Sequence, residues 1–330
     1  MANIIKRPPW SLPERMVTSE SAYQNRRQFL QALGFSGGSL AMGLAGCSSS
    51  EDPNLASGEE PSDSNALEAR YANGYPHARN PEFDRGWTLT NQRAAATYNN
   101  FFEFTTVKNR VYKMASALQT APWEIGISGN LETPRKIDAR ELIESMPLEE
   151  RVYRFRCVEA WAMVVPWTGF PLSKWLSKLK LWPEAKFVRF ETFGARPEAI
   201  GMSDLRYPWP YSEGLTLAEA MNPLTFVATG IYGKPLPKQH GAPLRLVVPW
   251  KYGYKSIKSI ARIEFTKKQP KTFWETLSAV EYPFESNVNP RIPHPRWSQA
   301  TERMIDTGAR VKTKLYNGYQ DDVSHLYPAA

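Results

Sequence analysis

Hydrophobic and polar positions alternate with the two-residue period of a half-buried β-strand in four segments of the chain. These segments are residues 123–128, 187–193, 244–248 and 260–265. They do not alternate regularly with helices, as the strands of a doubly wound parallel sheet would. The pattern therefore predicts an α+β fold with a large, irregular β component, mixed sheets and short helices in one main domain.

Helix signals in the sequence are short but well defined. Two residue pairs have capping-box spacing, namely Asp138 with Glu141 and Thr216 with Glu219. A proline at position 171 is suited to open a helix. The apolar face of that helix would consist of Leu172, Trp175, Leu176 and Leu179. We expect short helices at these three places.

The first 47 residues have the character of an export signal. Arg26 and Arg27, followed by Phe29 and Leu30, match the twin-arginine pattern. A weakly apolar stretch rich in glycine and alanine follows, as in a signal h-region. This predicts export of a folded protein to the periplasm. Residues 44–47 (Leu-Ala-Gly-Cys) also resemble a lipobox, so either a lipid anchor at Cys47 or an ordinary cleavage site nearby fits the sequence.

Residues 48–80 are expected to form a flexible polar linker. The part up to residue 70 has six serines, six acidic residues and no aromatic residue. Such a composition cannot bury enough apolar surface to fold. The linker is expected to lead into a folded domain at residues 81–330.

Composition narrows the class of protein. The chain is 42% hydrophobic and 12% aromatic, which is too apolar for a disordered protein. Its formal charge of +8 is spread over scattered basic residues, and no nucleic-acid-reading motif is present. The charge is better explained by a basic cleft for an anionic cofactor or substrate than by nucleic-acid binding.

One residue in the expected folded domain has conspicuous ligand chemistry. The sequence has no Walker loop and no GxGxxG motif, and its four histidines lack zinc-site spacing. Cys157, however, lies close to Arg154 and Arg156. We expect these arginines to lower the pKa of the thiol and favour the thiolate, which binds metals. From the residues alone, a buried structural cysteine is the alternative.

Several segments together resemble a known family. They are residues 98–104, 147–151, 156–161, 164–167, 241–245, 248–253 and 294–303. In this order they are similar to the catalytic subunits of bacterial periplasmic protein-methionine-sulfoxide reductases, which have the sulfite-oxidase-type molybdopterin-binding fold. The resemblance covers roughly residues 95–320 and extends to the twin-arginine leader.

The resemblance implies a cofactor and the residues that hold it. Cys157 would bind molybdenum beside the dithiolene of a single molybdopterin, giving one molybdenum-molybdopterin per chain. The pterin contacts implied by the matching motifs are Asn99, Phe102, Glu103, Thr192, His240, Arg245, Ser256, Ile257 and Lys258. Arg245 and Lys258 suit the phosphate of the pterin. His240 stands where the family has an asparagine, and both side chains can donate a hydrogen bond.

The resemblance also implies the reaction, the reduction of methionine sulfoxide residues in oxidised periplasmic proteins. The chain has no haem, flavin or iron–sulfur motif, so its electrons would come from a haem-b membrane subunit fed by the quinone pool. Two alternatives remain open at the level of sequence. One is a sulfite-oxidase-type reaction, and the other is a non-catalytic lipoprotein.

Overall fold

All four segments of alternating polarity form strands in the computed structural model, which describes residues 74–327. They are β1 (Glu124–Gly129), β5 (Phe187–Thr192), β9 (Arg245–Val247) and β10 (Ile260–Thr266). The described residues belong to one compact unit, Glu59–Ala330. The twin-arginine pair, Cys47 and most of the expected linker lie outside the described residues.

Two long strands were not anticipated. β3 (Glu149–Arg156) and β4 (Trp161–Pro171) form an antiparallel hairpin in which nearly every residue is buried. A strand covered on both faces shows no alternation, so its period is hidden in the sequence. The remaining strands are β2 (Arg135–Asp138), β6 (Ser212–Thr216), β7 (Phe226–Ile231), β8 (Lys234–Pro235), β11 (Thr301–Met304) and β12 (Arg310–Lys312).

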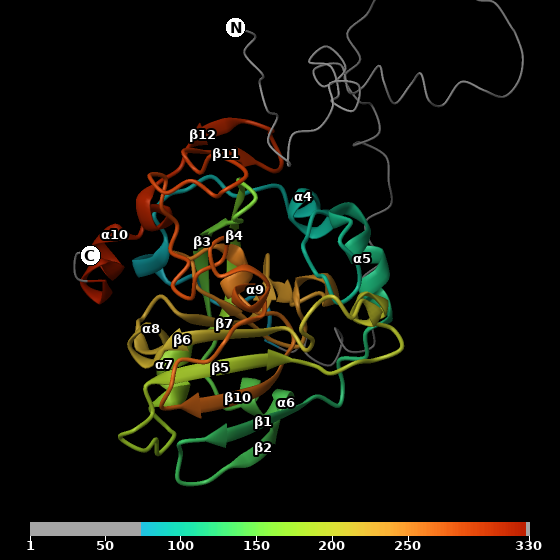
Figure 1. The fold of residues 1–330 in the computed structure, drawn as a ribbon, viewed down its shortest axis with the longest axis vertical. Helices are drawn as coiled ribbons and strands as arrows, with labels where there is room; N and C mark the ends of the chain where they lie inside the picture. Colours follow the sequence, from blue (N-terminus) through green and yellow to red (C-terminus); the bar gives the residue numbers. More distant parts are fainter. Residues whose placement is uncertain (1–73, 328–330) are drawn as a thin grey trace, which may run out of the picture. The chain divides into compact units, whose positions relative to one another are not determined.

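The strands form two sheets (Figure 1). One has five strands in the order β2-β1-β10-β5-β6, and the other has seven, with β12-β11-β4-β7-β8 as its main path. In the second sheet β3 pairs with β4 and β9 pairs with β7. Parallel pairs (β1 with β10, and β11 with β4) occur beside antiparallel pairs, which confirms the expected mixed sheets.

The three expected helices are present. α8 (Leu217–Met221) has the capping box between Thr216 and Glu219. α6 (Ala139–Glu144) begins at Asp138, whose side chain accepts a hydrogen bond from the backbone of Arg140. α7 (Leu172–Leu176) begins after Pro171 and buries Leu172, Trp175 and Leu176, but it ends before Leu179.

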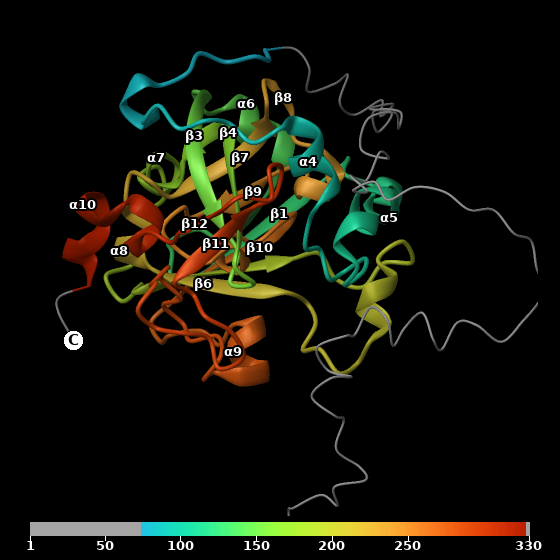
Figure 2. The same ribbon diagram turned by 90° about the horizontal axis from the view of Figure 1, so that it is seen from above.

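The other helices are also short. α4 (Gln92–Thr97) and α5 (Val111–Met114) contact each other, whereas α9 (Phe273–Ser278) lies away from them in Figure 2. α10 (Gln320–Val323) lies near the C-terminus. The 3-10 helices are Pro81–Phe83, Lys108–Arg110, Ala115–Ala117, Ile200–Ser203, Lys238–His240, Gly253–Lys255, Leu315–Gly318 and Ser324–Leu326. Within residues 74–327 no helix is long and apolar enough to span a bilayer.

The core lies between and around the sheets. Its largest fully buried aromatic side chains include Trp167, Phe190, Phe226 and Trp250. Tyr75, within the range expected to be linker, hydrogen-bonds the backbone carbonyl of Thr229 at 2.9 Å. The β3–β4 hairpin crosses this core, so the turn at its end is held by a rigid element.

Candidate functional site

Cys157 occupies the first position of the turn that joins β3 to β4. The Cys157 N–H donates to the Trp161 carbonyl at 2.9 Å, and the Ala160 N–H donates to the Cys157 carbonyl at 3.1 Å. Ala160 has a left-handed backbone with φ of 63°, which closes the turn tightly. The thiol is therefore carried at the end of a buried hairpin, where its position is well defined.

The turn lines a pocket whose empty space, including the part open to solvent, is about 850 Å³. Eight of the ten residues implied by the resemblance also line it: Asn99, Phe102, Glu103, Cys157, Arg245, Ser256, Ile257 and Lys258. They come from the segment between α4 and α5, from the β3–β4 turn, from β9 and from the loop before β10. The fold thus brings together residues that are far apart in the sequence.

Thr192 and His240 are the two members that do not line the pocket. The Thr192 hydroxyl donates to the Ser259 carbonyl at 3.2 Å, in the loop that follows Lys258. His240 is buried with its ring edge-on to Trp167 at 6.1 Å, and its Nδ1 has no hydrogen-bond partner among the described residues. Burial, with added repulsion from Arg245 and Lys258, lowers the pKa of His240 to about 3.

The Cys157 sulfur lies in a polar setting on its pocket side. The Asn100 amide and the Glu159 backbone N–H approach the sulfur at 3.6 and 3.5 Å. The Glu159 carboxylate in turn accepts hydrogen bonds from Asn100, Lys108 and Trp161 at 2.9 to 3.1 Å. The turn is therefore tied to the segment that carries Asn99, Phe102 and Glu103.

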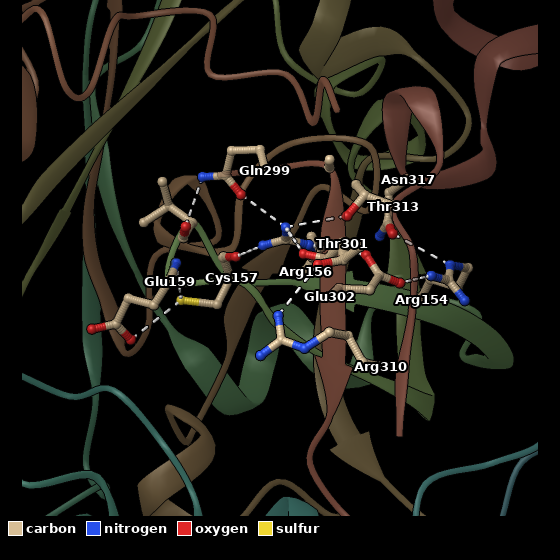
Figure 3. A network of polar contacts seen from close by, with 12 residues as sticks. Arg154, Arg156, Cys157, Glu159, Gln299, Thr301, Glu302, Arg310, Thr313 and Asn317 are labelled. Carbon is tan, nitrogen blue, oxygen red and sulfur yellow. Dashed lines mark hydrogen bonds and ion pairs between the residues drawn. The ribbon is translucent and has the colours of Figure 1, made fainter. Parts of the chain in front are cut away.

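The expected lowering of the thiol pKa is wrong. Burial raises the pKa of Cys157 well above its ordinary value, and the Glu159 carboxylate raises it further. The charge of Arg156 offsets only part of this rise. Both Arg154 and Arg156 contact the carboxylate of Glu302 (Figure 3). Both arginines therefore belong to an ion-pair network with Glu302.

Two cations, Arg245 and Lys258, also line the pocket. Arg245 is buried and donates to the backbone carbonyls of His240, Leu246 and Ser256 at 2.8 to 3.2 Å. Lys258 donates to the Asn100 carbonyl at 2.7 Å. Among the described residues, neither cation has a carboxylate within 4.0 Å. Burial lowers the pKa of Arg245 to about 9 and also lowers that of Lys258.

The other implied contacts are set by their own backbone neighbours. The Asn99 amide donates to the Ala96 carbonyl at 2.9 Å, at the end of α4. Burial raises the pKa of Glu103, which faces Lys258 electrostatically. The Ser256 hydroxyl accepts from the Val248 N–H at 3.0 Å. The Asn99 and Ser256 side chains are thus held in place by backbone groups of the protein.

Some pocket residues escaped the sequence reasoning. Asn100 and Glu159 fall inside matched segments, so their closeness to implied site residues was an available signal. An aromatic group shares the pocket with them: Tyr211, Tyr254, Trp274 and Tyr282. These four residues have no motif of their own, and only the fold places them together.

Metal-binding chemistry at the pocket centres on one sulfur. The described residues contain no group of three or more histidine, cysteine, aspartate or glutamate side chains that could hold a metal ion. Cys157 is the one free cysteine within the described range. A metal at this place would therefore need ligands from a cofactor in addition to the protein thiol.

Comparisons of the chain with known proteins show the family to which it belongs. A family model for an oxidoreductase molybdopterin-binding domain matches residues 112–274. The chain is 44% identical over 323 residues to the protein-methionine-sulfoxide reductase catalytic subunit MsrP of Xanthomonas axonopodis pv. citri, covering 96% of this chain and 95% of that protein. The MsrP catalytic subunit of Burkholderia mallei is 42% identical, with 96% and 93% covered. That of Pseudomonas syringae pv. tomato is 43% identical, with 95% and 94% covered.

Proposed function

Since this chain belongs to the family of protein-methionine-sulfoxide reductase catalytic subunits, which are molybdopterin-binding oxidoreductases, we propose that it reduces methionine sulfoxide residues in proteins. The family match confirms the expected molybdopterin-binding fold. The observation that carries the proposal is that one pocket joins the Cys157 thiol with two buried cations, and neither cation has a carboxylate within 4.0 Å among the described residues.

The residues present fit a molybdenum-pterin. Burying a cation without a carboxylate partner costs free energy, and an anionic ligand would remove that cost. Arg245 and Lys258 would hold the pterin phosphate, and Cys157 would supply a soft sulfur ligand to the metal. We expect one molybdenum-molybdopterin per chain. When bound, it supplies the two-electron chemistry of oxygen-atom removal.

The chain's own residues would position this chemistry. The Asn100 amide and the Glu159 backbone N–H, which both approach the Cys157 sulfur, would orient it. Overall, a methionine sulfoxide, two electrons and two protons give methionine and water. This reverses the oxidation that makes methionine polar and disrupts apolar packing.

The electrons must be delivered by another protein. The relatives are named catalytic subunits, which implies a partner subunit. We propose that the partner is a haem-b membrane subunit fed by the quinone pool.

We further propose that Arg26 and Arg27 direct export to the periplasm, with Cys47 as a candidate lipid anchor. The export signal is tested by replacing both arginines with lysine and fractionating the cells. The variant should stay in the cytoplasm.

The activity is tested with protein purified from a host that makes the cofactor. An oxidised protein substrate and a reduced dye as electron source should give turnover, and Cys157→Ser should lose it together with molybdenum. Val165→Ala, an equally buried change in the same hairpin but outside the pocket, should keep both. Molybdenum-loaded protein that oxidises sulfite and leaves methionine sulfoxide untouched would contradict the proposal.

A further inference from the structure

Residues 294–303 form a segment that matched the family but contributed no residue to the expected site. The structure places this segment directly against the Cys157 turn. Trp297 and Gln299 each donate a side-chain N–H to the Val158 carbonyl at 2.7 Å. The backbone N–H of Arg303 donates to the Ala160 carbonyl at 2.9 Å. The segment therefore binds two carbonyl groups of the turn.

A charged network supports the same turn from behind (Figure 3). The Arg156 Nε lies 2.9 Å from a carboxylate oxygen of Glu302, and both side chains are fully buried. Arg156 also donates to the Gln299 side-chain oxygen at 2.8 Å and to the Cys157 carbonyl. Arg154 contacts the other Glu302 oxygen. Gln299 thus bridges the charged network and the turn.

The direction of these contacts is informative. In Figure 3 the Cys157 sulfur points toward Glu159, while the Cys157 carbonyl points toward the Arg156 guanidinium. Arg156 thus contacts the backbone of the turn, whereas the sulfur is approached by Asn100 and Glu159, which line the pocket. Side chains that hold a ligand residue without touching the metal set the ligand's orientation and electronic properties.

We propose that Trp297, Gln299 and Glu302 are positioning residues for Cys157, fixing the turn so that its sulfur is presented to the cofactor. This inference rests on the proposed function, because it assumes that Cys157 is the metal ligand. These contacts determine where the sulfur lies. Their proposed effect on the metal site is therefore distinct from any effect on the stability of the fold.

The test removes the two donors to the Val158 carbonyl separately and together. Trp297→Phe keeps an aromatic ring that can stack on His294. In the wild type the ring centroids of Trp297 and His294 are 3.8 Å apart. Gln299→Met keeps the length of the side chain. Each single variant leaves one donor to the Val158 carbonyl in place. Trp297→Phe should cause a small loss, and Gln299→Met a larger one because it also removes the acceptor for Arg156. The double variant removes both, so the two changes should be strongly non-additive.

The measurements are molybdenum content, thermal unfolding, the molybdenum EPR signal, and kcat and KM for an oxidised protein, all on cofactor-loaded enzyme. For the double variant we expect an altered EPR signal and a kcat lower by about 10- to 100-fold with an unchanged KM. A folded double variant that has lost molybdenum would support the proposal equally. Arg310→Gln is the control, because Arg310 reaches the Thr301 hydroxyl at 3.3 Å and not the turn.

Two results would overturn the inference. One is a loaded double variant with the wild-type EPR signal and kcat. The other is a double variant that unfolds, or whose remaining folded fraction has the wild-type signal, because the contacts would then serve stability alone. The EPR signal does not depend on the substrate. If the loaded wild-type enzyme fails to reduce methionine sulfoxide while the double variant still alters the molybdenum signal, the proposed function is rejected and the positioning role stands.

Discussion

His240 gives the fold a specific sensitivity to acid. The side chain is 2% exposed, and burial together with the nearby charges of Arg245 and Lys258 lowers its pKa from 6.5 to about 3. Below pH 6.5 the unfolded chain binds a proton that the folded protein does not bind. Stability therefore falls as the pH drops from 6.5 toward 3, and the loss is absent above pH 6.5.

The size of the effect follows from the pKa difference. The ordinary histidine pKa, which applies to the unfolded chain, lies about 1.5 units above pH 5. Proton binding to His240 therefore favours the unfolded state by about 2 kcal/mol at pH 5. For a domain of this size that corresponds to a fall in Tm of about 4–8 °C. His240→Asn places a non-titrating amide at the same position. The variant should lack this part of the acid loss.

The assay is urea unfolding of the cofactor-free protein at pH 7.5 and pH 5, for the wild type and His240→Asn. The wild type should lose about 2 kcal/mol more than the variant between the two pH values. His325→Asn replaces an exposed histidine and should follow the wild type. Equal losses in the wild type and His240→Asn would refute the reasoning, since His240 would then not be the buried neutral group.

Three further predictions concern the pocket and its support. Arg245→Met should lower molybdopterin content at least about tenfold, because it removes a charged hydrogen bond to phosphate. The control Arg189→Met on β5 should keep its molybdopterin. The content is measured by extraction and fluorescence of the pterin. Glu302→Gln should lower the free energy of unfolding by about 3–5 kcal/mol in urea titration, because it leaves buried cations unpaired. Gly201→Ala would place a Cβ 2.1 Å from the Phe102 carbonyl, so it should shift the segment that carries Phe102 and reduce cofactor content in the same extraction.

One-sided burial made two of the strands visible in the sequence. β1, with its burial alternating along the chain, was visible as a two-residue period, and β10 was found in the same way. β3 and β4 are covered on both faces, so their sequence reads as a continuous buried run interrupted by arginines. Of these, Arg156 is fully buried against Glu302, which is 146 residues away in the chain. No local pattern can report such a partner.

The site could be predicted only in part for a related reason. From the residues alone, Cys157 was the single candidate; the other pocket residues came from resemblance of whole segments to a family. The pocket joins segments around positions 100, 157, 245 and 257, and hydrophobic periodicity carries no information about which loops meet. The aromatic residues Tyr254 and Trp274 have no distinguishing local sequence, so their place in the pocket depends on the fold.

The error about the Cys157 thiol has a geometric cause. Arg154 and Arg156 are two residues apart on β3, so they lie on the same face of the strand, and both reach Glu302. The Arg156 guanidinium contacts the Cys157 carbonyl rather than the sulfur, while burial raises the thiol pKa. Closeness in sequence therefore does not place these charges where they would outweigh the effect of burial on the thiol. A metal ion carries its own positive charge and displaces the thiol proton on binding, so in the proposed site the bound group itself makes Cys157 a ligand, and the arginines hold the turn.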